Sequence, residues 1–323
     1  MSGGTQGGAG PPSRQGAGPL APALTLLAAA ALCLLAAACT TQPPASRPSS
    51  PAAPRTSSPS PPVPGATQPA QPAPALRAIT WMMTRAALAS VMADPVLRER
   101  LSGSRIYEIL QPGQQLLRGV AAEPVLAFPS RSALAAAVHR DQIPAGTYGL
   151  LYDPEAWALT PAAEQRAPVA AATEAARITR ARGLRFIVAP ALNLTTLLAP
   201  GSSRPRWQRF LDLNLVASLA QIADAIDLQA QSLERDTATY QAFVRQAAGQ
   251  ARSANPRVTL LAGLSSNPPG APVTSQHLLD AVTATSAAVD GYWLNIPGAG
   301  PRCPTCNARQ PAVAMQMLQG LRE

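Results

Sequence analysis

Eight short runs rich in β-branched, aromatic and other apolar residues recur between residues 78 and 296, and helix-like segments separate them. Strands that alternate with helices form parallel sheets, because each helix returns the chain to the starting edge of the sheet. Eight units over about 245 residues fit the size of a (β/α)8 TIM-like barrel. The predicted strands are 78–83, 105–110, 124–129, 148–153, 184–190, 223–231, 257–265 and 290–296.

The second connection, QPGQQLLRGVAAE (111–123), has little helical character. An incomplete barrel or an open doubly wound sheet is therefore the alternative fold. Neither G-x-G-x-x-G nor G-x-x-x-x-G-K-[ST] follows any predicted strand, so the sequence does not favour a nucleotide site built on those loops.

The first third of the chain predicts an export signal and a tether. An uncharged run, ALTLLAAAALCLLAAAC, ends at Cys39. Small residues before that cysteine resemble a bacterial lipobox, which implies that Cys39 is lipidated and becomes the N-terminus after cleavage. An uncleaved transmembrane anchor over residues 20–38 is the alternative, since that length approaches a bilayer span.

Residues 40–75 are rich in proline, serine and alanine and contain almost no large apolar side chain. Such a segment buries too little surface to fold, and its prolines keep it extended. We therefore predict a signal and lipobox in 1–39, a disordered tether in 40–75 and a barrel domain in 76–323. The expected location is the outer face of the cytoplasmic membrane, with the lipidated N-terminus as the membrane contact.

The chain has 26 arginines, no lysine and 17 acidic residues. These arginines are scattered, without the runs or interleaved aromatic residues that single-strand binders use. We therefore expect no nucleic-acid partner.

Ligands of such barrels bind at the carboxyl ends of the strands. Amide and indole side chains are common at those ends. Amides both donate and accept hydrogen bonds, and indole rings stack on sugar rings, so a saccharide or cell-wall polymer is the expected partner. The predicted ligand-binding residues are Asp227, Gln229, Gln231, Asn193, Trp293 and Asn295.

Polar and apolar residues alternate in the sixth predicted strand, which places Asp227, Gln229 and Gln231 on one face. The sequence DAIDLQAQ (224–231) resembles the D-x-x-D-x-D-x-E strand of family 18 glycoside hydrolases, the chitinase-like barrels, although that family carries it on the fourth strand. In the family the last aspartate orients the substrate's acetamido group, and the glutamate protonates the leaving oxygen. Glutamines occupy both positions here, and an amide has no proton to give near neutral pH.

Two other functions remain open at this stage. An active glycosidase needs two carboxyl groups across the scissile bond, for which Asp153, Glu155 and Glu108 are the candidates, with Glu234 as another choice for the second acid. The other alternative is a non-catalytic envelope scaffold. Whether the protein is an enzyme stays undecided.

No cofactor and no metal are expected. The sequence has two histidines, lacks lysine for Schiff-base chemistry, and contains no G-x-S-x-G motif. Cys303 and Cys306 lie in a loop rich in proline and glycine after the last predicted strand. Outside the cytoplasm this spacing favours a short-loop disulfide, which would stiffen one rim of the pocket.

Overall fold

The computed structural model describes residues 75–300, 303 and 306–322. The predicted signal segment with Cys39, and the predicted tether up to residue 74, lie outside the described residues. Among the helices that are described, none combines the length and the apolar character needed to cross a bilayer.

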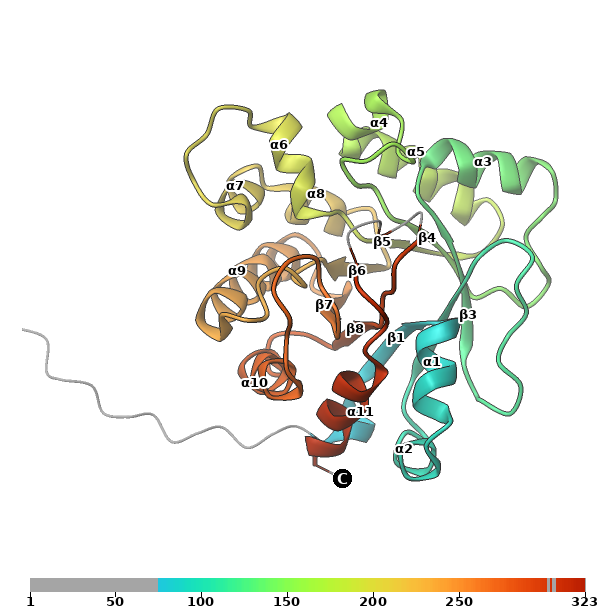
Figure 1. The fold of residues 1–323 in the computed structure, drawn as a ribbon. Helices are drawn as coiled ribbons and strands as arrows, with labels where there is room; N and C mark the ends of the chain where they lie inside the picture. Colours follow the sequence, from blue (N-terminus) through green and yellow to red (C-terminus); the bar gives the residue numbers. More distant parts are fainter. Residues whose placement is uncertain (1–74, 301–302, 304–305, 323) are drawn as a thin grey trace, which may run out of the picture. The chain divides into compact units, whose positions relative to one another are not determined.

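Eight parallel strands pair in chain order and close into a barrel, with β8 hydrogen-bonded to β1 (Figure 1). The predicted TIM-like barrel is confirmed, and the open or incomplete sheet is wrong. The strands are β1 (Thr80–Thr84), β2 (Ile106–Leu110), β3 (Glu123–Phe128), β4 (Gly149–Tyr152), β5 (Arg185–Val188), β6 (Ala225–Leu228), β7 (Thr259–Ser265) and β8 (Gly291–Asn295).

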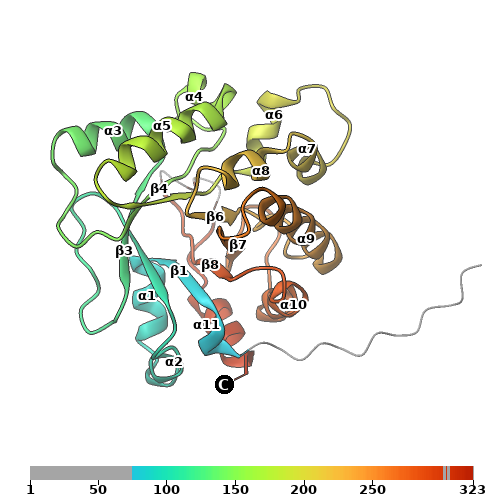
Figure 2. The same cartoon turned by 180° about the vertical axis from the view of Figure 1, so that it is seen from behind.

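Helices surround this barrel, with α3, α4 and α5 on one side and α9 and α10 on the other (Figure 2). Over residues 111–122, all of which are described, no helix forms, as the weak helical pattern of that connection indicated. The helices are η1 (Leu76–Ala78), α1 (Arg85–Met92), α2 (Pro95–Arg100), α3 (Arg131–His139), α4 (Ala162–Arg166), α5 (Pro168–Arg180), η2 (Leu192–Leu194), α6 (Thr195–Leu198), α7 (Arg206–Asp212), α8 (Leu215–Ala220), α9 (Thr237–Ala254), α10 (Ser275–Thr285) and α11 (Pro311–Gly320).

The two faces of each strand supply two apolar clusters. One fills the lumen and includes Met82, Tyr107 and Leu261, whereas the larger one lies between the strands and the helices. Ile226 and Leu228 of β6 belong to the outer cluster, so the side chain of Asp227 between them faces the lumen. The predicted alternation of this strand is confirmed.

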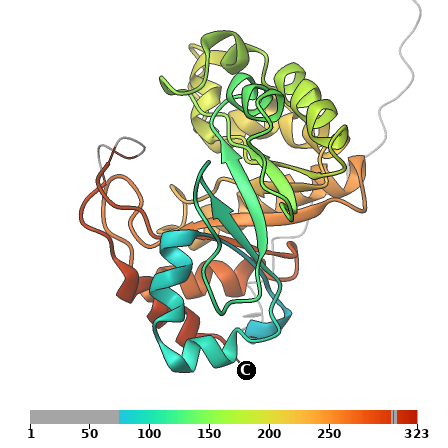
Figure 3. The same cartoon turned by 90° about the vertical axis from the view of Figure 1, so that its right-hand side faces the viewer.

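The first and last described residues of the domain lie side by side. Ala75 forms a parallel bridge with Arg322, and the Leu76 N–H donates to the Arg322 carbonyl oxygen at 2.8 Å. The last helix, α11, lies beside α1 (Figure 3), so the end of the chain completes the helical layer at the point where the barrel closes.

Closure depends on a glycine in β8. A Cβ built at Gly291 would lie 1.9 Å from the Thr80 carbonyl oxygen, which is far inside van der Waals contact. Thr80 and Gly291 are paired residues of β1 and β8. A side chain at position 291 would therefore push apart the two strands that close the barrel.

We predict that Gly291→Ala lowers the free energy of unfolding by about 3 kcal/mol, the upper range for overpacking, because the clash is with backbone. Gly249→Ala is the matched control, since Gly249 lies within α9 and a Cβ there meets nothing within 4 Å. That control should gain about 1 kcal/mol from helix propensity. Urea unfolding of both variants measures the difference, and equal stability would contradict the closure argument.

Candidate functional site

A cavity of about 720 Å³ lies at the carboxyl ends of the strands, the end at which barrels of this kind bind ligands. Six of the residues expected from the sequence line it: Asp153, Glu155, Gln229, Gln231, Trp293 and Asn295. Other lining residues were not expected from the sequence, among them Thr84, Trp157 and Arg309.

Gln229 is held by two acceptors. Its Nε2 donates to Asp153 Oδ1 at 2.6 Å and to the Ala189 carbonyl oxygen at 2.7 Å. Both acceptors lack hydrogens, so a side chain between them must bring two donors, which an amide has and a carboxylate does not. A glutamine at this position therefore satisfies its surroundings, and a ligand meets only the acceptor end of the amide.

Asp227 is a lumen-facing residue of β6, two residues before Gln229, and its side chain has no solvent exposure. Neither of its carboxyl oxygens has a hydrogen-bond partner among the described residues. Burial, together with the negative charge of Asp153, raises the pKa of Asp227 well above its ordinary value. The carboxyl group of Asp227 thus lies under the floor of the cavity, in surroundings that favour its neutral form.

Gln231 occupies space that a neighbouring strand leaves open. A Cβ built at Gly263 of β7 would lie 2.4 Å from Gln231 Nε2. The glycine therefore makes room for the glutamine side chain, which lines the cavity beside β7. As in Gln229, the functional group here is an amide without an acidic proton.

Glu155 lines the cavity, and Asn193 stands behind it. Asn193 Nδ2 donates to Glu155 Oε2 at 3.4 Å, and Asn193 Oδ1 accepts from the Ala156 N–H at 2.8 Å. Asn193 is not among the residues that line the cavity. Its position is that of a support for the loop after β4, which differs from the ligand contact expected from the sequence.

Two indole rings border the cavity. Trp293 belongs to the lumen cluster and is 7% exposed. Trp157 comes from the loop after β4, where its Nε1 donates to Thr160 Oγ1 at 2.8 Å. Because that hydroxyl in turn donates to the Pro129 carbonyl oxygen at 2.6 Å, the ring of Trp157 is tied to the end of β3.

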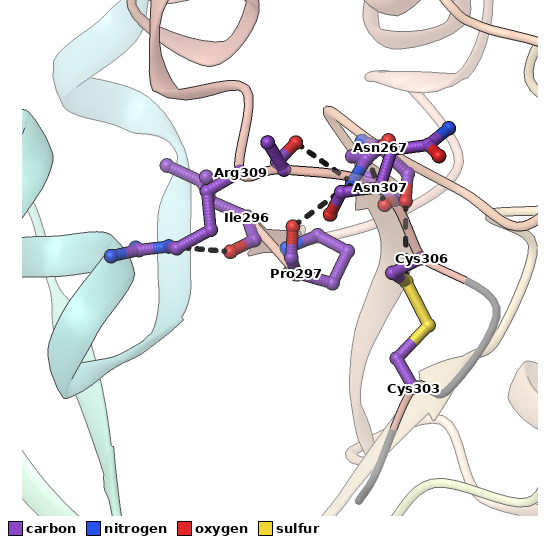
Figure 4. Close-up of a disulfide and its surroundings, with 9 residues drawn as sticks. Asn267, Ile296, Pro297, Cys303, Cys306, Asn307 and Arg309 are labelled. Carbon is purple, nitrogen blue, oxygen red and sulfur yellow. Dashed lines mark hydrogen bonds between the residues drawn. A yellow bond between two sulfur atoms is a disulfide. The ribbon is translucent and has the colours of Figure 1, made fainter. Parts of the chain in front are cut away.

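The rim on the β8 side is a loop held by Asn267 (Figure 4). Asn267 Nδ2 faces the carbonyl oxygens of Pro297, Asn307 and Ala308, each at 3.2 Å. The predicted disulfide between Cys303 and Cys306 is present, with the two Cα atoms 5.3 Å apart. Cys303 lines the cavity, so the bridge lies at the rim, where it was expected.

Arg309 joins this rim to α1. Its Nε donates to the Ile296 carbonyl oxygen at 3.2 Å, and an Nη donates to the Ala86 carbonyl oxygen at 2.9 Å. The guanidinium thus bridges the loop after β8 to the first turn of α1, across the closure of the barrel. Arg309 gives the cavity, which Asp153 and Glu155 also line, a positive group.

The other two candidate acids lie away from the cavity. Glu108 is a buried residue of β2, where it accepts from the Leu117 N–H at 3.0 Å and from Arg85 at 3.4 Å, an arrangement that supports the helix-free connection. Glu234 is buried and accepts from the Ser265 N–H at 2.9 Å. The structure therefore brings Asp153 and Glu155 together but does not bring Glu108 to them.

The described residues contain no group of three or more His, Cys, Asp or Glu side chains placed to hold a metal ion. His277 instead completes a capping box at the start of α10, with its Nδ1 accepting from the Thr274 N–H at 3.2 Å.

Asp227→Asn is predicted to change how stability depends on pH. Because the folded-state pKa is raised, the unfolded chain releases this proton first as pH rises, and the wild-type protein loses stability above the ordinary aspartate pKa. The advantage of the variant should therefore grow with pH, by up to about 1.4 kcal/mol per unit. Thermal or urea unfolding from pH 4 to 8 measures it.

Asp236→Asn is the control with the opposite sign. Bonds from the Thr239 hydroxyl and N–H lower the pKa of Asp236, so this variant should lose stability relative to wild type as pH rises toward about 4, the ordinary aspartate pKa, and then run parallel to it. The unfolding series for this control therefore starts at about pH 2. Parallel pH profiles for wild type and Asp227→Asn would mean that Asp227 is charged in the folded protein.

Comparison with known proteins adds no family. No protein-family model and no curated protein matches the chain. A chitinase from Chromobacterium violaceum aligns at 12% identity over 76% of this chain and 100% of its own, with a TM-score of 0.41. The catalytic domain of a family GH18 chitinase from the fern Peteris ryukyuensis aligns at 12% identity over 74% of this chain and 99% of its own, with a TM-score of 0.44.

A triosephosphate isomerase from Bartonella henselae aligns at 11% identity over 68% of this chain and 92% of its own, with a TM-score of 0.35. At such identities and TM-scores, none of these likenesses bears on activity. The chain is a closed eight-stranded TIM-like barrel on the strength of its own strand pairing.

Proposed function

We propose that the cavity at the carboxyl ends of the strands binds a neutral saccharide, and that the domain belongs to an exported, lipid-anchored protein. The observation that carries the proposal is one cavity in which the indoles of Trp157 and Trp293 accompany the amides of Gln229, Gln231 and Asn295. Indole faces pack on the C–H faces of sugar rings, and amides bond hydroxyl groups in either direction. A volume of about 720 Å³ is in the range of small-molecule sites.

The charges in the cavity also suit a sugar. Asp153, Glu155 and Arg309 all line the cavity, and carboxylates accept hydrogen bonds from sugar hydroxyls without needing a charged ligand. Gln229 keeps its amide oxygen for the ligand because both of its N–H groups are engaged. The donors and acceptors are thus mixed, as recognition of hydroxyl groups requires.

We do not propose that β6, or the residues directly after it, supply a general acid. Gln229 and Gln231 have no acidic proton, and Asp227 is wholly buried. Within the described residues, Asp153 and Glu155 are the acids that line the cavity. Any hydrolysis would have to use that pair, because Glu108 is bonded elsewhere.

Saccharide binding should be visible in tryptophan fluorescence, since Trp157 and Trp293 line the cavity whereas Trp81 and Trp207 do not. A neutral oligosaccharide prepared from cell-wall or environmental polymers should shift the emission in a saturable way. Trp293→Phe and Trp157→Phe should each weaken binding about tenfold, or about 1.4 kcal/mol, through the smaller stacking surface. Trp207→Phe, the matched control, should bind as the wild type does.

Absence of a saturable change with every saccharide would favour the envelope scaffold and overturn the proposal. Reducing ends should be assayed in the same mixtures. New reducing ends that disappear in Asp153→Asn and Glu155→Gln would show that the cavity hydrolyses its ligand rather than only binding it.

Anchoring rests on the sequence before the domain, where an apolar run ends at Cys39. Cys39→Ser should abolish incorporation of a labelled fatty acid in a bacterial host. Cys33→Ser is the control, because Leu32 precedes that cysteine where a lipobox has a small residue, and its labelling should be unchanged. Unlabelled wild-type protein that stays in the membrane would indicate a transmembrane anchor instead.

A further inference from the structure

The opposite end of the barrel contains a second cavity, of about 570 Å³. Its lining comes from residues that precede or open strands: Arg105 before β2, Tyr148 before β4, Arg185 at the start of β5, and Thr259 at the start of β7. This is the amino end of the strands, so the cavity is separate from the proposed saccharide site. Nothing inferred about it depends on the proposed function.

Positive charge dominates this cavity. One aspartate, Asp224, is the acidic residue among its described lining, and Glu123 lies just outside as the ion-pair partner of Arg105 at 3.1 Å. Four guanidinium groups thus face two carboxylates, which leaves an excess of two positive charges. The arginines that line the cavity are Arg105, Arg180, Arg185 and Arg257.

Arg105 is held in place before any ligand arrives. Its guanidinium lies 4.9 Å from the ring centre of Tyr107 and 5.4 Å from that of Tyr148, and the two rings are stacked on each other. Its Nη2 also donates to the Tyr148 hydroxyl at 2.7 Å. Holding this side chain in one geometry removes part of the ordering cost that a flexible surface arginine meets on binding.

Asp224 forms ion pairs with two more arginines of the cavity lining, Arg185 and Arg180. Its Oδ1 accepts from Arg185 at 3.1 Å, and its Oδ2 lies 3.8 Å from an Nη of Arg180 while accepting from the Phe186 N–H at 2.9 Å. One carboxylate thus serves two guanidinium groups and a backbone donor. Its single charge cannot neutralise both arginines.

Arg257 supplies a guanidinium without an ion pair among the described residues, although it is exposed and lines the cavity. Its backbone is fixed, because the Arg257 N–H donates to Asn255 Oδ1 at 3.1 Å, and Asn255 Nδ2 donates to the Ala220 carbonyl oxygen at 2.8 Å. The side chain is therefore placed at the opening with its charge uncompensated.

We propose that this amino-end cavity binds a small ligand through a phosphoryl group. Guanidinium forks match the oxygens of phosphate, and a phosphoryl group carries close to two negative charges at neutral pH, equal to the excess of positive charge in the cavity. A concave space of about 570 Å³ suits a small molecule rather than a flat membrane surface. Tyr148, a partly buried residue of the cavity lining, offers an aromatic contact for the rest of the ligand.

Inorganic phosphate is the probe. It should bind the purified full-length protein, kept in neutral detergent, at one site by calorimetry and raise the melting temperature more than sodium chloride of equal ionic strength. Arg257→Gln and Arg180→Gln should each weaken phosphate binding about tenfold or more, the effect of losing one charged hydrogen bond. Neither variant should alter saccharide binding at the other end.

Arg166→Gln is the charge-matched control, because Arg166 is exposed at the end of α4 and does not line the cavity. Its phosphate affinity should equal that of the wild type. Equal weakening in Arg166→Gln and Arg257→Gln, or equal stabilisation by phosphate and chloride, would reduce the effect to general screening and overturn the proposal.

A second arm separates a free ligand from a lipid headgroup. Vesicles of phosphatidylglycerol and of phosphatidylcholine should bind wild type and Arg257→Gln in the same ratio. A preference for anionic vesicles that requires Arg257, without saturable phosphate binding, would contradict a small-molecule site and indicate a membrane contact.

Discussion

The pairing of β8 with β1 leaves no room for a side chain at position 291, and the rest of the domain depends on that close approach. A Cβ there would meet the Thr80 carbonyl oxygen at 1.9 Å. Once the two strands pair, the barrel is closed and each strand must direct alternate residues into the lumen. The side chain of Asp227 then points inward, and Gln229 and Gln231 continue the same face to the cavity. Closure of the barrel thus brings the alternate polar residues of β6 and its continuation to one cavity.

Inside the cavity, the amides are explained by their neighbours. Gln229 lies between a carboxylate and a carbonyl oxygen, where an aspartate would face two acceptors with no hydrogen to offer. Below it, burial and the nearby charge of Asp153 raise the pKa of Asp227 well above its ordinary value. A second charge beside Asp153 would be costly in that environment. The glutamines therefore fit the electrostatics of this barrel, whatever the ancestry of the strand.

Strand number and the facing of β6 could be predicted from the sequence, because period-two alternation is a local property of the chain. The disulfide followed in the same way from two cysteines close in sequence. The sequence offers Glu108 as a candidate acid, but nothing local indicates that its carboxylate turns to the Leu117 N–H. Arg309 could not be predicted, because its position depends on a hydrogen bond to the Ala86 carbonyl oxygen of α1, 223 residues away in the sequence. Trp157 could have been predicted, because it closely follows Asp153 and Glu155 in the sequence.

The two ends of the barrel differ in chemistry. The carboxyl end joins indoles and amides with two carboxylates and one guanidinium group, whereas the amino end gathers arginines around one aspartate. This difference predicts a neutral ligand at one end and an anionic ligand at the other. The most direct test of saccharide binding is a crystal structure of the protein with an oligosaccharide that raises its melting temperature. We expect a sugar ring against Trp293 or Trp157, with hydroxyl groups bonded to Gln229 or Asn295. A sugar bound elsewhere, with the carboxyl-end cavity empty, would contradict it.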